Sequence, residues 1–201
     1  MEMVPNNNVS HIPHVFDRSG LAAISDFDSL EWKETFDTLE SDQLIFLAKE
    51  NEFRSPEYKW PRDPLHTWSR AWEYPYVWHH LRRERALWPS HLRPNVVDLG
   101  SGVTFFPFSA AGMGCDVTCI DIDPVAQQDI ARAASCIQKS SGAVDFRLRT
   151  ELALPFENME VDVVYCISVL EHIANPEMTI KEVARILKPG GLFLLTIDLD
   201  L

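Results

Sequence analysis

VVDLGSGVTFFPFSAAG, residues Val96 to Gly112, is the stretch that decides the fold. An apolar run is followed by the glycine pair Gly100 and Gly102, and then by a segment rich in small and aromatic residues. A strand, a glycine-rich turn and a helix in this order bring the backbone close to a nucleotide in many α/β proteins. Where the third glycine of a dinucleotide loop often stands, the chain has Thr104. The stretch therefore predicts a nucleotide site and leaves open which nucleotide it holds.

Short apolar runs alternate with helical periods from here to the end of the chain. The runs predicted to be buried strands are VVDL (96–99), DVTCI (116–120), VDFRL (144–148), VDVVYCIS (161–168) and LFLLTI (192–197). Helix starts are predicted at Asp123 with Pro124 and at Asn175 with Pro176, and Pro189 is predicted to stop the second helix. This alternation predicts a Rossmann-like α/β fold, a doubly wound and mostly parallel sheet with helices on both faces.

The chain divides near Asn95. We expect an N-terminal helical, aromatic-rich extension or lid (1–94) and a nucleotide-binding core (95–201). Ser29 and Ser41 are predicted helix N-caps within the extension.

Five of the six tryptophans lie between Tyr58 and Trp88. Trp68 and Trp72 have the spacing of one helix face, and Pro75 is predicted to interrupt that helix. Most of these rings are expected to pack helices onto the sheet. Tyr74 and Tyr76 are the expected exceptions, because their hydroxyl groups need polar partners.

Composition excludes several classes of function. A net charge of −12 over 201 residues opposes binding to nucleic acid, and no apolar run is long enough to span a membrane. Cys119 falls on the predicted strand 116–120 and Cys115 directly precedes it, so an extended chain would hold their side chains too far apart for joint metal binding. We therefore expect a cytoplasmic protein with reduced cysteines and no metal site.

Asp121 closes the second predicted strand, 21 residues after Gly100. An acidic residue at this place can accept hydrogen bonds from both hydroxyl groups of a ribose. The alternative for Asp121, and equally for Asp98, is a carboxylate that caps a turn.

Four motifs then resemble those of the class I methyltransferases that use S-adenosylmethionine, in particular the small-molecule group that includes ubiquinone-biosynthesis enzymes. The motifs are VVDLGSG (96–102), VTCIDID (117–123), LPFENMEVDVVYCISVLEHI (154–173) and LKPGGLFLLT (187–196). They cover about half of the chain, from Asn95 onward. The resemblance implies methyl transfer from S-adenosylmethionine to a small-molecule acceptor.

The same resemblance implies a set of cofactor contacts. Asp98 would orient the glycine loop near the cofactor's amino group, and Asp121 would hold the ribose. The other implied contacts are Gly100, Ser101 and Gly102 for the methionine portion, Ile122 for the adenine, and Ser168 for the floor of the site. No diphosphate has to be held, so Thr104 is free to serve as the N-cap of a helix that has Pro107 in its first turn.

The adenine contact after the third strand departs from the family pattern. Many relatives have an acidic residue where this chain has Thr150. Glu151 would replace it if the loop shifts by one residue, and the backbone of Leu152 is the alternative.

Glu171 and His172 follow the fourth strand and are the candidates for a catalytic base. A base is needed only where the acceptor is a poor nucleophile, such as an alcohol. Because the LEH sequence recurs in relatives with different acceptors, the alternative is that His172 only shapes the site. The alternative for the whole chain is a domain that binds S-adenosylmethionine without catalysis, as a truncated enzyme or a regulatory partner.

The fifth predicted strand ends close to Leu201 and would lie at the edge of the sheet. An apolar, unpaired edge is a liability. We expect a missing C-terminal segment, the N-terminal half or a second copy of the chain to cover it.

Overall fold

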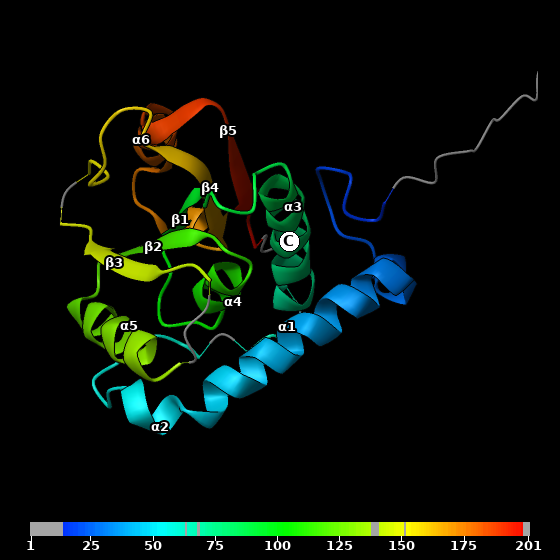
Figure 1. Ribbon diagram of the computed structural model, residues 1–201, viewed down its shortest axis with the longest axis horizontal. Coiled ribbons are helices and arrows are strands. Elements are labelled where there is room, and N and C mark those ends of the chain that lie inside the picture. Colours follow the sequence, from blue (N-terminus) through cyan, green and yellow to red (C-terminus); the bar gives the residue numbers. More distant parts are fainter. Residues whose placement is uncertain (1–13, 63, 68, 138–140, 151, 199–201) are drawn as a thin grey trace, which may run out of the picture.

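The computed structural model describes residues 14–62, 64–67, 69–137, 141–150 and 152–198. Its centre is a five-stranded parallel sheet in the order β3-β2-β1-β4-β5 (Figure 1). The strands are β1 (Asn95–Leu99), β2 (Asp116–Asp121), β3 (Val144–Leu148), β4 (Val161–Ile167) and β5 (Leu187–Thr196). The predicted fold class and all five strands are confirmed.

Helices cover both faces of the sheet. Successive strand residues point to opposite sides, so these apolar strands present apolar side chains on both faces. Val96 and Val163 pack into one core with α3 (Arg70–Ala86), α4 (Phe106–Gly112) and α5 (Pro124–Cys136). Val97 and Val164, their neighbours along the strands, pack into a second core with α6 (Pro176–Ile186). The sheet is therefore doubly wound.

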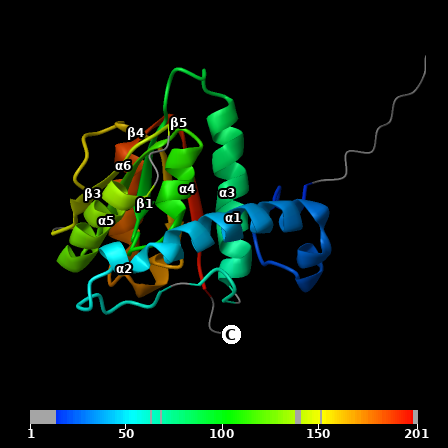
Figure 2. The ribbon, with the colours of Figure 1, turned by 60° about the horizontal axis from the view of Figure 1, so that its bottom comes forward.

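The N-terminal helices lie on the α4 and α5 side. After a short 3₁₀ turn, η1 (Ile24–Asp28), α1 (Leu30–Ala48) begins at Ser29, whose hydroxyl accepts the Trp32 N–H at 3.2 Å. It contacts α3 and α4, and α2 (Glu50–Phe53) contacts α5 (Figures 1 and 2). The N-terminal half thus contributes to the same core as the strands.

Three predicted boundaries were wrong. Ser41 lies inside α1, where its hydroxyl donates to the Asp37 carbonyl at 2.9 Å instead of capping a new helix. Thr104 is not an N-cap, because α4 begins after Phe105, which makes no side-chain cap. α6 ends at Ile186 without Pro189, and β5 begins at Leu187.

β5 begins earlier than predicted because Leu187 already pairs with β4. Val161 pairs with Leu187 and Val163 pairs with Leu192, so the KPGG segment between them bulges out of the ladder. Gly190 has φ +80°, a conformation that glycine adopts without strain. The predicted helix stop is therefore a bulge inside the strand.

Pro75 was also expected to break its helix, yet α3 runs through it. A proline has no N–H for the carbonyl four residues earlier, here that of Ala71. The indole Nε1–H of Trp32 in α1 donates to this carbonyl at 2.8 Å. A side chain from another helix therefore replaces the missing backbone donor. Trp68, the expected neighbour of Trp72, lies outside the described residues.

β5 is the edge strand of the described sheet and pairs only with β4 along its length. What covers its other side stays a prediction. Within the part of the chain that the structure describes, no helix is both long and apolar enough to span a bilayer.

Candidate functional site

The carboxyl ends of four neighbouring strands bring the predicted cofactor residues together in a row. Leu152 follows β3, Asp121 ends β2 and Ile122 follows it, the segment 100–102 follows β1, and Ser168 follows β4. Ligands of open parallel sheets bind along this edge. A larger hollow, of about 220 Å³, lies at the opposite ends of β1, β2 and β3 and contains none of these residues.

The turn after β1 requires both of its glycines. Gly100 has φ +79° and Gly102 has φ +50°. A Cβ atom on Gly100 would lie 2.4 Å from a methyl carbon of Val169, and one on Gly102 would lie 2.8 Å from the Tyr58 hydroxyl oxygen. The N–H of Gly100 donates to the Ile120 carbonyl at 2.8 Å, which fixes the turn to β2.

Asp121 joins the turns after β1 and β2. One carboxylate oxygen accepts the Gly102 N–H at 2.9 Å, and the other accepts the N–H groups of Ile122 at 2.7 Å and Asp123 at 3.1 Å. A carboxylate offers about four lone-pair positions. Asp121 therefore caps its turn, and a ribose diol would take the place of at least one of these backbone donors.

Asp98 is buried at the end of β1, directly beside Tyr165 of β4. Burial, with the charge of Asp98 as the second cause, raises the pKa of the Tyr165 hydroxyl well above its usual value. The two side chains line a cavity of about 30 Å³ with Tyr74, Gly100 and Ser101. Ser101 is buried here, and its hydroxyl donates to the Gly102 carbonyl at 3.2 Å.

A strap of the N-terminal half, residues 54–60, crosses the turns after β1 and β2. Arg54 donates to the Val103 carbonyl at 3.0 Å, and the Tyr58 hydroxyl accepts the Val103 N–H at 2.9 Å. Trp60 donates from its indole to the Asp123 carboxylate at 3.0 Å. Burial raises the pKa of Tyr58 to about 12, so its phenol is neutral at neutral pH. None of these contacts was predicted.

Glu73 of α3 is a further residue that sequence reasoning missed. Its buried carboxylate accepts the Ser168 hydroxyl at 2.6 Å and forms an ion pair with Arg70. Tyr74, next to it, lines the small cavity, and its ring packs against Phe105 and Phe106, so a polar role of its hydroxyl stays a prediction. Tyr76 instead packs edge-on against His80, with ring centroids 4.7 Å apart.

The candidate bases lie directly beyond Ser168, in the short 3₁₀ turn η2 (Leu170–His172). One carboxylate oxygen of Glu171 accepts the Asp198 N–H at 2.9 Å. His172 is exposed. Both residues therefore lie at the carboxyl edge, with His172 open to an incoming molecule.

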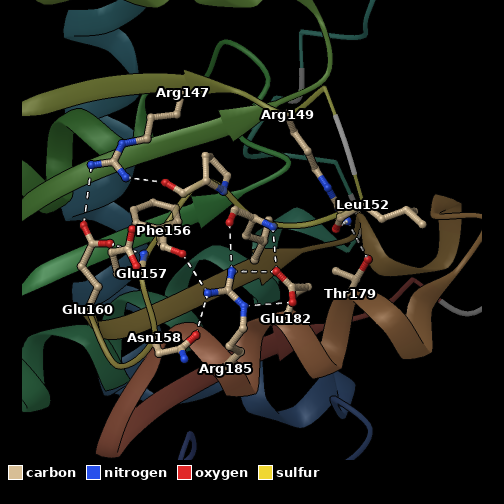
Figure 3. A network of polar contacts seen from close by, with 12 residues as sticks. Arg147, Arg149, Leu152, Phe156, Glu157, Asn158, Glu160, Thr179, Glu182 and Arg185 are labelled. Carbon is tan, nitrogen blue, oxygen red and sulfur yellow. Dashed lines mark hydrogen bonds and ion pairs between the residues drawn. The ribbon is translucent and has the colours of Figure 1, made fainter.

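The loop after β3 is held by α6 (Figure 3). Arg185 donates to the carbonyls of Leu154 and Phe156, and Arg149 donates to the Leu152 carbonyl at 2.7 Å. The Leu152 backbone carbonyl, an expected adenine contact, thus has an internal partner. The Leu152 side chain is 59% exposed and that of Ile122 is 65% exposed, so both present apolar surface at the edge. Glu151 lies outside the described residues.

Comparison with known proteins agrees with this geometry. Residues 97–195 match a protein family described as a methyltransferase domain. Residues 97–195 are therefore a methyltransferase domain. S-adenosylmethionine is the cofactor of this family.

A ubiquinone biosynthesis O-methyltransferase from Xanthomonas oryzae is 38% identical over 105 residues, which are 51% of this chain and 43% of that protein. A relative of the same name from Xanthomonas campestris is 37% identical over 105 residues, which are again 51% of this chain and 43% of that protein. The match thus spans less than half the length of these curated relatives. Among solved structures, a putative sarcosine dimethylglycine methyltransferase from Galdieria sulphuraria has a TM-score of 0.54 and 22% identity over 81% of this chain and 59% of that one. This likeness shows the fold.

The residues at the carboxyl edge fit the chemistry of S-adenosylmethionine. Asp98, Asp121 and Glu73 are carboxylates, which suit a ribose diol and an ammonium group. The turn itself, residues 99–104, contains no lysine or arginine for a phosphate, and the nearby Arg54 forms an ion pair with Glu50. The relaxed glycine pattern and the acidic residues at the carboxyl edge therefore favour S-adenosylmethionine over a dinucleotide.

Proposed function

We propose that this chain transfers a methyl group from S-adenosylmethionine to a small-molecule acceptor. One observation carries the proposal, namely the spatial order of the four turns at the carboxyl edge. Adenine, ribose and methionine are joined in that order in the cofactor. The exposed Ile122 and Leu152 suit the adenine, Asp121 suits the ribose, and the turns after β1 and β4 suit the methionine.

Bound there, the cofactor supplies a methyl group on a positively charged sulfur, ready for in-line displacement. The protein contributes by holding the acceptor in line with that methyl group. The curated relatives are named O-methyltransferases, which favours a hydroxyl acceptor for this chain. A hydroxyl group is a poor nucleophile, and His172 beyond β4 is the side chain we propose to take its proton. Glu171 is the second candidate.

Residues 1–94 act as a lid over the cofactor in this proposal. The cavity beside Asp98 measures about 30 Å³, whereas ligand pockets have volumes of about 300 to 1,000 Å³. The strap 54–60 is bonded to Val103 and Asp123 at this edge, and we propose that it moves away when a cofactor enters. The cytoplasmic location stays a prediction, and so does a second copy or a further segment along β5.

Asp121→Ala tests the proposal through cofactor binding. Each lost hydrogen bond to a charged acceptor lowers affinity by about tenfold or more, so we expect calorimetry to show a loss of this size or greater. Asp145→Ala is the matched control, because this exposed carboxylate lies on the neighbouring strand near the opposite end of the sheet. Unchanged affinity in Asp121→Ala would place the ribose elsewhere.

Methyl transfer is tested separately, with a methyl-labelled cofactor, a pool of small metabolites and detection by mass spectrometry. A labelled product supports the enzyme. Tight binding without any labelled product would favour the alternative, a binding module without catalysis.

A further inference from the structure

A buried polar contact joins the N-terminal half of the chain to the end of β4. Ser168 and Glu73 lie 95 residues apart in sequence, and the Ser168 hydroxyl donates to the Glu73 carboxylate at 2.6 Å. The residues are 5% and 4% exposed. Burying a carboxylate is costly unless charges and hydrogen bonds compensate it. Arg70 and Ser168 supply that compensation, so the position of the Glu73 carboxylate depends on both partners.

Ser168 has an unusual backbone at this contact. Its φ is +48°, a region that residues with a side chain seldom adopt. Such a conformation persists only where the surroundings fix it, and it is found most often at functional sites. Here the Ser168 N–H donates to the Thr196 carbonyl at 3.1 Å and the side chain is held by Glu73. Glu73 therefore fixes the turn that leads from β4 to the candidate bases.

The direction of the hydrogen bond limits what Ser168 can bind. A hydroxyl group has one proton and two lone pairs. Because the proton is directed to Glu73, the oxygen offers only lone pairs to a ligand. A ligand group that donates hydrogen bonds fits this oxygen, and a ligand carboxylate does not.

The charges around the contact favour a cation. Glu73 and Asp98 are two buried carboxylates, and Arg70 forms an ion pair with Glu73. Tyr74 and Ile167, the sequence neighbours of Glu73 and Ser168, line the same small cavity as Asp98. Asp98 thus lines the cavity itself, and Glu73 and Ser168 each lie one residue along the chain from a residue that lines it.

We propose that Glu73, acting through Ser168, selects the ammonium group at the amino-acid end of S-adenosylmethionine. This inference rests on the proposed function, and it makes an N-terminal residue outside the matched domain a positioning residue of the cofactor site.

Three ligands and the variant Glu73→Gln test the proposal. S-adenosylmethionine and S-adenosylhomocysteine both have the amino-acid group, and 5′-methylthioadenosine lacks it. In Glu73→Gln we expect calorimetry to show about tenfold weaker binding of the first two and unchanged binding of the third. Glu84→Gln is the control, because it removes the same charge eleven residues further along α3, about 16 Å away along the helix axis.

Ser168→Ala tests whether Glu73 acts through the hydroxyl. We expect a similar loss for the two amino-acid ligands, and little further loss in the double variant, because the two changes remove one interaction. In methyl transfer, both variants should raise KM for S-adenosylmethionine more than they lower kcat.

The outcomes separate the possible failures. Equal loss of all three ligands in Glu73→Gln would mean that the residue only supports the fold, and unchanged binding of all three would remove it from the site. Additive losses in the double variant would overturn the route through Ser168. A parent chain that binds none of the three ligands would overturn the proposed function itself.

Discussion

Replacing Gly100 by alanine measures how tightly the glycine turn is built. Two costs add at this position. Gly100 has φ +79°, which costs a residue with a side chain about 1 to 2 kcal/mol. The new methyl group would also lie 2.4 and 2.6 Å from the two methyl carbons of Val169, a stiff β-branched side chain. Overlap of this kind costs about 1 to 3 kcal/mol more.

Gly190→Ala is the matched control for the backbone cost. Gly190 has φ +80°, and a Cβ atom there would meet nothing within 4 Å. The difference between the two variants therefore isolates the overlap with Val169. We expect Gly100→Ala to lower the free energy of unfolding by about 2 kcal/mol more than Gly190→Ala.

Urea unfolding provides the measurement. For a slope near 2 kcal/mol per molar, this difference moves the midpoint by about 1 M. In a Val169→Ala background the penalty of Gly100→Ala should shrink, because the two closest carbons are gone. Equal midpoints for Gly100→Ala and Gly190→Ala would refute the proposed close packing between the turn and the segment after β4.

Two further predictions concern histidines. His172→Ala should slow methyl transfer without weakening cofactor binding, because the exposed ring is proposed to face the acceptor. Equal rates of methyl transfer in the variant and the parent would show that His172 is not the catalytic base. Burial, followed by the nearby His14, lowers the pKa of His79 to about 4 from the ordinary 6.5. Because the unfolded chain binds this proton more readily, the free energy of unfolding should fall by up to about 3 kcal/mol as the pH drops from 6.5 to 4. His79→Phe should flatten that slope in urea titrations, and an unchanged slope would exclude His79 as its cause.

The strands of the sheet were predictable because buried parallel strands are continuous apolar runs, a local signal. The glycine turn and Asp121 were predictable for a similar reason, since their spacing follows from one strand, one helix and the next strand. The contacts between Tyr58 and Val103 and between Glu73 and Ser168 join residues 45 and 95 positions apart. No local pattern indicates which distant turn a side chain reaches, so these partners could be found only in the structure.

The wrong helix boundaries have the same origin. Ser41 and Pro75 were assigned from intrinsic preference, as a cap and a breaker. Within α1, Ser41 bonds the preceding turn of its own helix, and Pro75 is tolerated because another helix supplies a donor. Tertiary contacts thus override a local preference at both positions.

Because the Trp32 indole donates to the Ala71 carbonyl, the effect of replacing Trp32 depends on which residue stands at position 75. With alanine in place of Pro75, α3 would regain its own N–H donor and the indole would compete for a carbonyl that is already bonded. With phenylalanine in place of Trp32, the carbonyl would lose its donor while the proline remained. Neither change alone is neutral, and the two together restore a complete set of bonds. Trp32 and Pro75 are therefore expected to be gained and lost as a pair in the descent of this chain, so that a protein with one residue but not the other has a different packing of α1 on α3.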